Sequence, residues 1–288
     1  AGRRVEAESH LWRGAKIWDD IILEHPHLRD AADHAHARQW LGGMLMRTKR
    51  FEPAERELVK ANQIYEHLVA TEPDNAEWRG RLAHNRSYLG DLYFRRGEFS
   101  RSAEYRRKAT ELREALYQEY PHVYEHQRRL VVCYFDLMLS CAKEKKYDEA
   151  RELIDKRHQL ILEFERSYPQ APRKPGRFAW AVYELGKLMF EQGDLEGARE
   201  QFQRAHDYFV QDAVEFPTQF KAQHWLSWFL VSCPLVEFRD HLRARDPARH
   251  ALDLKPDDPD AIGVLGVVEY RHDNLRGAAA ALHEAMRL

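Results

Sequence analysis

Residues 89–121 have the sequence LGDLYFRRGEFSRSAEYRRKATELREALYQEYP, which contains all the landmarks of one repeating unit. A Leu-Gly pair ends at Gly90, the polar turn RGEF ends at Phe99, a small residue follows at Ala109, and Pro121 closes the stretch. Apolar residues between these landmarks recur at three- and four-residue steps, which is the periodicity of a helix and not of a strand. The stretch therefore predicts two helices joined by a short turn, the second ended by a proline that cannot continue it.

The same landmarks recur along the chain. The closing prolines are 47 or 48 residues apart, except that the last interval is 39 residues. They are Pro26, Pro73, Pro121, Pro169, Pro217 and Pro256. The leucines Leu41, Leu89, Leu137 and Leu185 and the small residues Ala54, Ser102, Ala150 and Ala198 keep the same register. Self-similarity at a fixed period indicates a repeat array. The predicted units, together one domain over 1–288, are 1–26 (partial), 27–73, 74–121, 122–169, 170–217, 218–256 (atypical) and 257–288.

The final unit resembles the tetratricopeptide repeat (TPR). Residues 260–288, DAIGVLGVVEYRHDNLRGAAAALHEAMRL, place Leu265, Gly266, Tyr270, Leu275, Ala278 and Ala285 at the spacing of that family. The resemblance implies an all-α fold, a right-handed solenoid of stacked antiparallel helix hairpins (a TPR-like superhelix) with about 13 helices. The inner units exceed the family's usual length of about 34 residues, which predicts roughly two more turns per helix. Small residues at the recurring positions predict close helix crossings.

Several departures from the family pattern concern the ends of the chain. In the unit 218–256, a short first helix ends at Cys233-Pro234, and residues 234–247 are predicted to be a loop. These last units resemble the C-terminal TPR regions of large bacterial proteins, many of which have a Ser/Thr kinase domain upstream. The first 24 residues resemble the second helix of a hairpin without the first. We therefore expect the chain to be a fragment of a longer protein.

The composition of the chain and the absence of known motifs exclude several classes of function. The 45 Lys and Arg residues nearly balance 47 Asp and Glu residues, which argues against a uniformly basic nucleic-acid-binding protein. No run of apolar residues is long enough to predict a membrane span. Three cysteines without a CxxC pair (Cys133, Cys141 and Cys233) favour a reducing, cytoplasmic location over a disulfide framework or a zinc site. Because no catalytic or phosphate-binding motif is present, we predict no enzyme activity, cofactor or metal, and any kinase activity would belong to upstream sequence.

The resemblance also indicates a binding surface. In the family, the first helix of each hairpin lines a concave face, and positions two before, two after and five after the landmark leucine point into it. The candidates carried over in this way are Asp91, Phe94, Phe135, Leu139, Tyr183, Lys187, Phe190, Trp228 and Tyr270. This set is mainly aromatic and apolar, and aromatic residues dominate many interfaces. It lacks the Lys/Asn/Arg set with which chaperone-binding members hold a carboxylate. The alternative is that the rings only fill space between adjacent helices.

We predict a non-enzymatic scaffold that binds a protein or peptide in this groove, as the regulatory region of a bacterial signalling protein. Two other hypotheses remain. Basic residues at 95–113 and 173–177 would suit an anion or a nucleic acid, although a solvated helix face with internal ion pairs explains them more simply. A structural spacer is the third hypothesis, in which the open ends of the array pair in a homodimer.

Overall fold

The computed structural model describes residues 10, 12–13, 16–17, 28–171 and 173–287. This part of the chain contains twelve named α-helices, one 3-10 turn and no strand. The all-α prediction is therefore confirmed. The predicted partial unit at 1–26 lies almost entirely outside the described residues.

The helices form six consecutive hairpins, and we call the first helix of each hairpin helix A and the second helix B. The hairpins are α2 (Leu28–Arg47) with α3 (Phe51–Thr71), α4 (Ala76–Arg95) with α5 (Phe99–Glu119), α6 (Tyr124–Lys143) with α7 (Tyr147–Ser167), α8 (Ala179–Glu191) with α9 (Leu195–Glu215), α10 (Phe220–Ser232) with α11 (His241–Leu254), and α12 (Pro259–Arg271) with α13 (Leu275–Arg287). The 3-10 turn η1 (Val236–Phe238) lies between α10 and α11.

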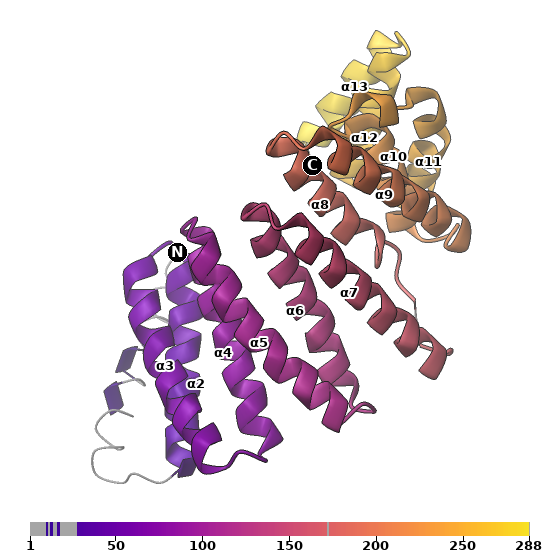
Figure 1. Ribbon diagram of the computed structural model, residues 1–288. Coiled ribbons are helices and arrows are strands. Elements are labelled where there is room, and N and C mark those ends of the chain that lie inside the picture. The colour runs from indigo at the N-terminus through magenta and orange to yellow at the C-terminus, as the bar shows by residue number, and fades with distance from the viewer. Residues whose placement is uncertain (1–9, 11, 14–15, 18–27, 172, 288) are drawn as a thin grey trace. The chain divides into compact units, whose positions relative to one another are not determined.

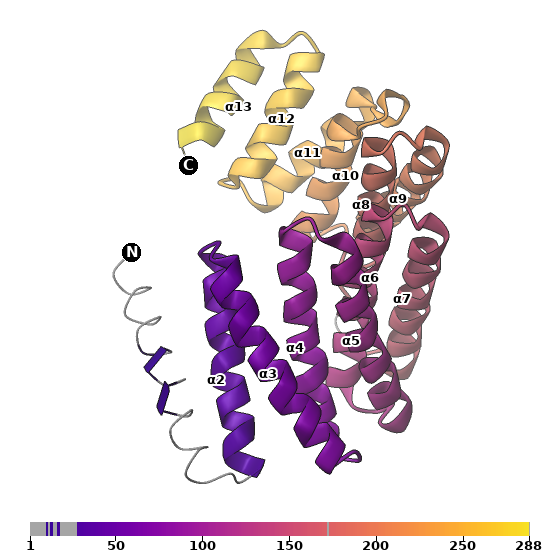
Figure 2. The same ribbon diagram turned by 60° about the vertical axis from the view of Figure 1, so that its left-hand side comes forward.

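Contacts divide the chain into two compact units, unit 1 (Ala1–Phe164) and unit 2 (Glu165–Leu288). Within unit 1, α2 packs on α3, α3 on α4, α4 on α5 and α5 on α6, so successive hairpins are neighbours in space (Figure 1). Within unit 2, the hairpins from α8 to α13 also follow one another, and α10 touches α12 directly (Figure 2). Each unit is thus a stack of antiparallel helix pairs.

In five of the six hairpins, the turn between helices A and B has the same backbone conformation. A residue with positive φ stands in each of these five turns: Lys49, Gly97, Lys145, Gly193 and Asp273. The next amide then donates back to a carbonyl five residues earlier, as from Glu98 to Tyr93 at 2.9 Å. This is the left-handed cap that satisfies carbonyls at a helix end, and glycine adopts it without the steric cost that a side chain brings.

The landmark residues form the contact between helices A and B. The four landmark leucines and the four small residues after the turns are all buried, at 3% exposure or less. A Cβ on Gly42 would lie 2.6 Å from Cγ of Leu58, and one on Gly90 would lie 2.6 Å from Cγ of Arg106. Close crossing at these glycines is confirmed, because no larger side chain fits without displacing a neighbour.

The closing prolines and the helix lengths also follow the prediction in most units. Helix B ends two residues before its proline, for example at Thr71 before Pro73 and at Glu119 before Pro121. Helices α2 to α7 have 20 or 21 residues each, which confirms the extra turns of the long-helix variant.

Two sequence predictions are wrong in unit 2. Helix α8 has only 13 residues, because Pro175 and Gly176, with φ of 75°, hold the preceding segment in a loop. Residues 241–247, predicted to be a loop, instead form the first part of α11. The Asp240 side chain caps this helix by accepting a hydrogen bond from the amide of Arg243 at 2.9 Å, and Pro247 lies inside it.

The close crossing at Gly42 leads to a stability prediction. Gly42→Ala should lower the free energy of unfolding by about 1–3 kcal/mol, because the new Cβ overlaps Leu58. The matched control is Gly263→Ala in α12, where nothing lies within 4 Å of the new Cβ. That change should stabilise the helix by about 0.5–1 kcal/mol. Urea unfolding followed by circular dichroism measures both, and effects of the same sign would contradict this account.

Candidate functional site

The four predicted groove residues of unit 1 lie on α4 and α6, which are both helices A. Asp91, Phe94, Phe135 and Leu139 are all half-buried. The Phe94 ring contacts the Phe99 ring edge-on, with the centroids 5.4 Å apart. Each of these side chains is therefore partly covered by neighbouring residues and partly open to solvent.

Arg106, on helix α5, contacts several residues of α4 and α6, including two of the predicted groove residues. Its guanidinium is 5% exposed and donates to the Asp91 carboxylate at 2.7 Å, to the Asp136 carbonyl at 2.6 Å and to Ser140 Oγ at 2.8 Å. It also lies 4.7 Å from the centroid of the Phe94 ring. The predicted polar contact Asp91 thus already has a strong internal partner.

The predicted residues of unit 2 are divided between core and surface. Tyr183 is only 5% exposed, and its ring packs against Phe202, Phe229 and Trp228 at centroid distances of 5.1–6.1 Å. This packing agrees with the space-filling alternative given above for the aromatic residues. Lys187, Phe190 and Trp228 are half-buried, whereas Tyr270 on α12 is 57% exposed.

A pocket of about 550 Å³ lies along the three helices A of unit 2, α8, α10 and α12. Three tryptophans dominate its wall: Trp180, Trp225 and Trp228. The Trp180 ring is perpendicular to Trp225, at 5.4 Å, and tilted by 40° to Trp228, at 5.2 Å. His224, Ser232 and Asp260 add polar groups to the lining of the pocket. We call this site the tryptophan pocket.

The sequence analysis found Trp228 but missed Trp180 and Trp225. Trp180 precedes Tyr183 by three residues and Trp225 precedes Trp228 by three, so helical spacing could have linked each pair. No comparable spacing in the sequence indicated the close packing around Gly176. A Cβ there would lie 2.3 Å from the Trp225 ring and 2.7 Å from the Trp180 ring, so the loop approaches both rings only as glycine.

A smaller pocket of about 220 Å³ lies in unit 1 between α4 and α6, with α5 as its floor. Helix α4 contributes His84, Ser87, Tyr88 and Asp91, helix α6 contributes Arg129, Val132, Cys133 and Asp136, and helix α5 contributes Arg113. Each helix A supplies its four residues at spacing i, i+3, i+4 and i+7, which places them along one face. We call this site the polar trough.

Two pKa shifts describe the electrostatics of the polar trough. Burial, with Arg129 and Arg113 nearby, lowers the pKa of His84 to about 4. Burial raises the pKa of Asp136 to about 6, with Arg106 opposing the shift and Asp91 adding to it. The end near His84 is therefore electropositive, and the end near Asp136 disfavours negative charge.

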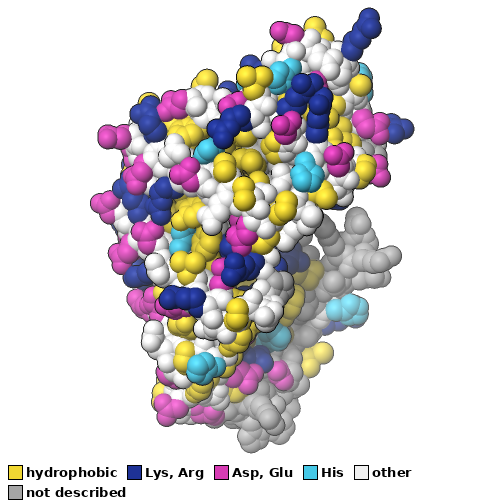
Figure 3. Space-filling view, turned by 90° about the vertical axis from the view of Figure 1, so that its right-hand side faces the viewer, with side chains coloured by type: hydrophobic (Ala, Val, Ile, Leu, Met, Phe, Trp, Pro, Cys, Tyr) yellow, Lys and Arg dark blue, Asp and Glu magenta, His cyan; other side chains and the backbone are white. Residues whose placement is uncertain are grey.

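The basic surface predicted at 95–113 is largely neutralised by acidic neighbours. Arg96 and Arg101 both pair with Glu55 and Glu98. Arg107 pairs with Glu149 and Lys108 with Glu104, while Arg106 and Arg113 are buried. Figure 3 likewise shows acidic and basic side chains interspersed over the face in view. This arrangement matches the solvated helix face that the sequence favoured, because paired cations offer little to an external anion.

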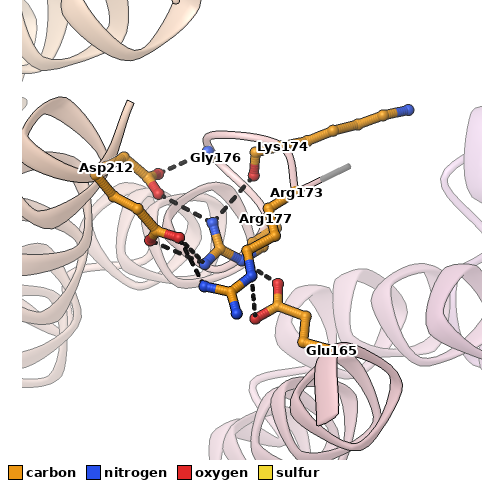
Figure 4. Close-up of polar contacts among 7 residues, drawn as sticks. Glu165, Arg173, Lys174, Gly176, Arg177 and Asp212 are labelled. Atoms are coloured by element: carbon orange, nitrogen blue, oxygen red, sulfur yellow. Dashed lines mark hydrogen bonds and ion pairs between the residues drawn. The ribbon is translucent and has the colours of Figure 1, made fainter. Parts of the chain in front are cut away.

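In the second basic segment, 173–177, the two arginines also have acidic partners (Figure 4). Arg177 lies 2.6 Å from Glu165 and 3.0 Å from Glu215, and 3.5 Å from Asp212. The Gly176 amide donates to Asp212 at 2.6 Å, yet burial still raises the pKa of that carboxyl. This cluster anchors the loop before α8, and so positions the backbone at Gly176 against the tryptophans.

Within the described residues, no group of three or more His, Cys, Asp or Glu side chains is arranged to hold a metal ion. None of the helices formed by those residues has the length and apolar character needed to cross a bilayer. All three cysteines are free and buried.

The Arg177 cluster leads to a prediction with a matched control. Arg177→Met should cost about 3 kcal/mol of unfolding free energy, because it leaves the carboxylate of Asp212, only 6% exposed, without its counter-ion. Arg173→Met removes a guanidinium that is 46% exposed and should cost less than about 1 kcal/mol. Thermal and urea unfolding compare the two variants, and equal losses would show that the burial of Arg177 has no special effect.

The shifted pKa of Asp136 leads to a pH-dependent prediction. Between the usual value of 3.8 and about 6, the folded chain binds more protons at this site than the unfolded chain, so stability falls as the pH rises through that window. Asp136→Asn removes the ionisation and should be about 2 kcal/mol more stable than the wild type at pH 7.5, with little difference at pH 4.

The control for this titration is Asp148→Asn, because the Asp148 side chain is fully exposed. It should show no such pH-dependent gain. Urea unfolding at the two pH values measures the effect, and a loss of stability for Asp136→Asn at pH 7.5 would contradict the assignment.

Comparisons with known proteins bear on the fold. No protein-family model matches the chain, and no curated protein matches it in sequence. The STAND protein PH0952 from Pyrococcus horikoshii, which has a tetratricopeptide repeat sensor, matches 98% of this chain and 42% of its own length, at 14% identity and a TM-score of 0.53.

Two further structures are similar over most of both chains. BtubC from P. vanneervenii matches 99% of this chain and 90% of its own, at 17% identity and a TM-score of 0.49. A tetratricopeptide repeat protein from Parabacteroides merdae matches 98% and 93%, at 14% identity and a TM-score of 0.45. With the hairpins and landmark contacts described above, the likeness to PH0952 identifies the fold of this chain as a TPR-type array, an all-α solenoid of antiparallel helix hairpins.

Proposed function

We propose that this chain is a non-catalytic scaffold that binds a protein or peptide on the helix A surface of unit 2. The observation that carries the proposal is the tryptophan pocket, in which three half-buried indoles line a cavity of about 550 Å³. Large aromatic side chains gathered at one concave place are the usual anchors of protein interfaces, since they bury much apolar area and lose little conformational entropy.

The rings of this pocket are held in place before any partner arrives. Trp180 contacts Tyr183, Phe209, Trp225 and Trp228, with ring centroids 5.2–5.7 Å apart. Below them Phe209 and Phe229 are almost completely buried. A rigid wall lowers the ordering cost of binding, which favours affinity. We infer that an apolar or aromatic side chain of the partner fills the pocket, and that Asp260, His224 and Ser232 orient the partner's backbone.

The sequence supports a proposal for the kind of protein to which this chain belongs and for its cellular location. We place the chain in a bacterial signalling protein, because its last units resemble TPR regions of large bacterial proteins with kinase domains. Free, buried cysteines support a cytoplasmic location. The nucleic-acid hypothesis is the weaker one, since most cations of the two basic segments have acidic partners or are buried. A spacer or a homodimer remains as an outcome of the binding experiment.

The test selects peptides from a phage-displayed library on the immobilised chain and measures their affinity by calorimetry. Trp225→Ala and Trp228→Ala should each weaken binding at least tenfold, since loss of an anchor costs about 2 kcal/mol. The control is Leu242→Ala on α11, whose side chain is 75% exposed outside the pocket. Peptides that bind all variants equally would move the site elsewhere, and a chain that selects no peptide but dimerises in light scattering would support the self-association hypothesis.

A further inference from the structure

The polar trough of unit 1 contains a buried cation, the Arg113 guanidinium, that has no counter-ion among the described residues. Arg113 is 7% exposed, and its guanidinium donates to the Gly80 carbonyl at 2.6 Å. No carboxylate of the described residues lies within 4.0 Å of it. Burial accordingly lowers the pKa of this guanidinium. A charge removed from water without an opposite charge is costly, so Arg113 is electrostatically unsatisfied in the free chain.

The second group is the half-buried carboxyl of Asp136, further along the same trough. No donor among the described residues reaches the Asp136 carboxyl, because the neighbouring Arg106 donates to the Asp91 carboxylate and to the backbone carbonyl of Asp136. The carboxyl lines the trough between α4 and α6. The charge of Arg106 therefore offsets only part of the cost of ionising this carboxyl.

The remaining charged groups keep the two ends distinct. Arg129 is beside Arg113 in the trough but is already paired with Glu125 at 2.6 Å, which leaves Arg113 as the unmatched cation. Asp91 is likewise paired with Arg106. Arg129 and Asp136 are seven residues apart on α6, and this corresponds to about 10 Å along the helix. The trough thus has a positive end and a negative end within the length of one small molecule.

We propose that the polar trough binds a small dipolar ligand whose carboxylate pairs with Arg113 and whose ammonium group pairs with Asp136. Such a ligand matches both unsatisfied groups at once, whereas a simple anion or a simple cation matches only one of them. The volume of about 220 Å³ suits a group the size of an amino acid. The ligand could be a free amino acid, or a Glu and a Lys side chain on one face of a bound segment. This site is separate from the tryptophan pocket and does not depend on the function proposed for that pocket.

The first experiment titrates the full chain by calorimetry with glycine, 4-aminobutyrate and 6-aminohexanoate, which separate the two charges by increasing lengths. At least one should bind with a Kd of about 1 mM or tighter. Hexanoate and hexylamine each carry one charge and should bind at least tenfold more weakly than the best dipolar compound. Equal binding by hexanoate, or no binding by any dipolar compound or by the peptide below, would overturn the proposal.

A blocked peptide distinguishes the two sources of the ligand. Acetyl-Gly-Glu-Ala-Lys-Gly-amide has no free termini, and in an extended segment its Glu and Lys side chains point to the same side. Binding of the peptide alone supports a segment of a partner protein as the occupant. Binding of the free compounds alone supports a small-molecule ligand.

Variants of the two unmatched groups complete the test. Arg113→Met and Asp136→Asn should each weaken binding at least tenfold, while their unfolding midpoints at pH 7.5 stay the same or rise, because each removes an uncompensated charge. Arg128→Gln is the control, since its guanidinium is 43% exposed and pairs with Glu125 outside the trough. Unchanged affinity in the two trough variants, or lost stability without lost affinity, would assign the two groups a structural role only.

Discussion

The close crossing of two helices at small residues is the contact on which every hairpin depends. A glycine after the landmark leucine, or a small residue after the turn, lets one backbone approach the side chains of the other, as Gly42 approaches Leu58 and Gly90 approaches Arg106. The turn conformation then fixes the direction in which helix B returns. Because each hairpin repeats this contact, the helices A of successive hairpins become neighbours. Their outer faces form the surfaces on which the pockets lie.

Helix B also contributes side chains to those surfaces, by reaching between two helices A. Arg106 and Arg113 belong to α5, yet their guanidinium groups reach between α4 and α6. Arg106 donates to a carboxylate, a hydroxyl and a carbonyl, whereas Arg113 has only a carbonyl as partner among the described residues. This difference separates a structural arginine from one that can take a ligand, since unsatisfied buried charges are retained at the expense of stability.

In unit 2 the same hairpin architecture has a shorter helix A at α8. The loop before α8 replaces two helical turns, and the Arg177 cluster holds it against Trp180 and Trp225. A full-length helix would place side chains where Gly176 now lies. The tryptophan pocket therefore depends on ion pairs at some distance from the rings, because those pairs set the path of the backbone beneath them.

Periodicity, proline punctuation and the landmark residues were enough to predict the helices, their order and their crossings, because these depend on local propensity and on spacing within one hairpin. The length of α8, the start of α11 and the burial of Tyr183 were decided by packing with neighbouring hairpins. The same holds for the sites. The sequence indicated that aromatic residues line helices A. Only the tertiary structure brought Trp180 next to Trp225 and placed no carboxylate of the described residues beside Arg113, since pairing between residues of different hairpins has no period along the chain.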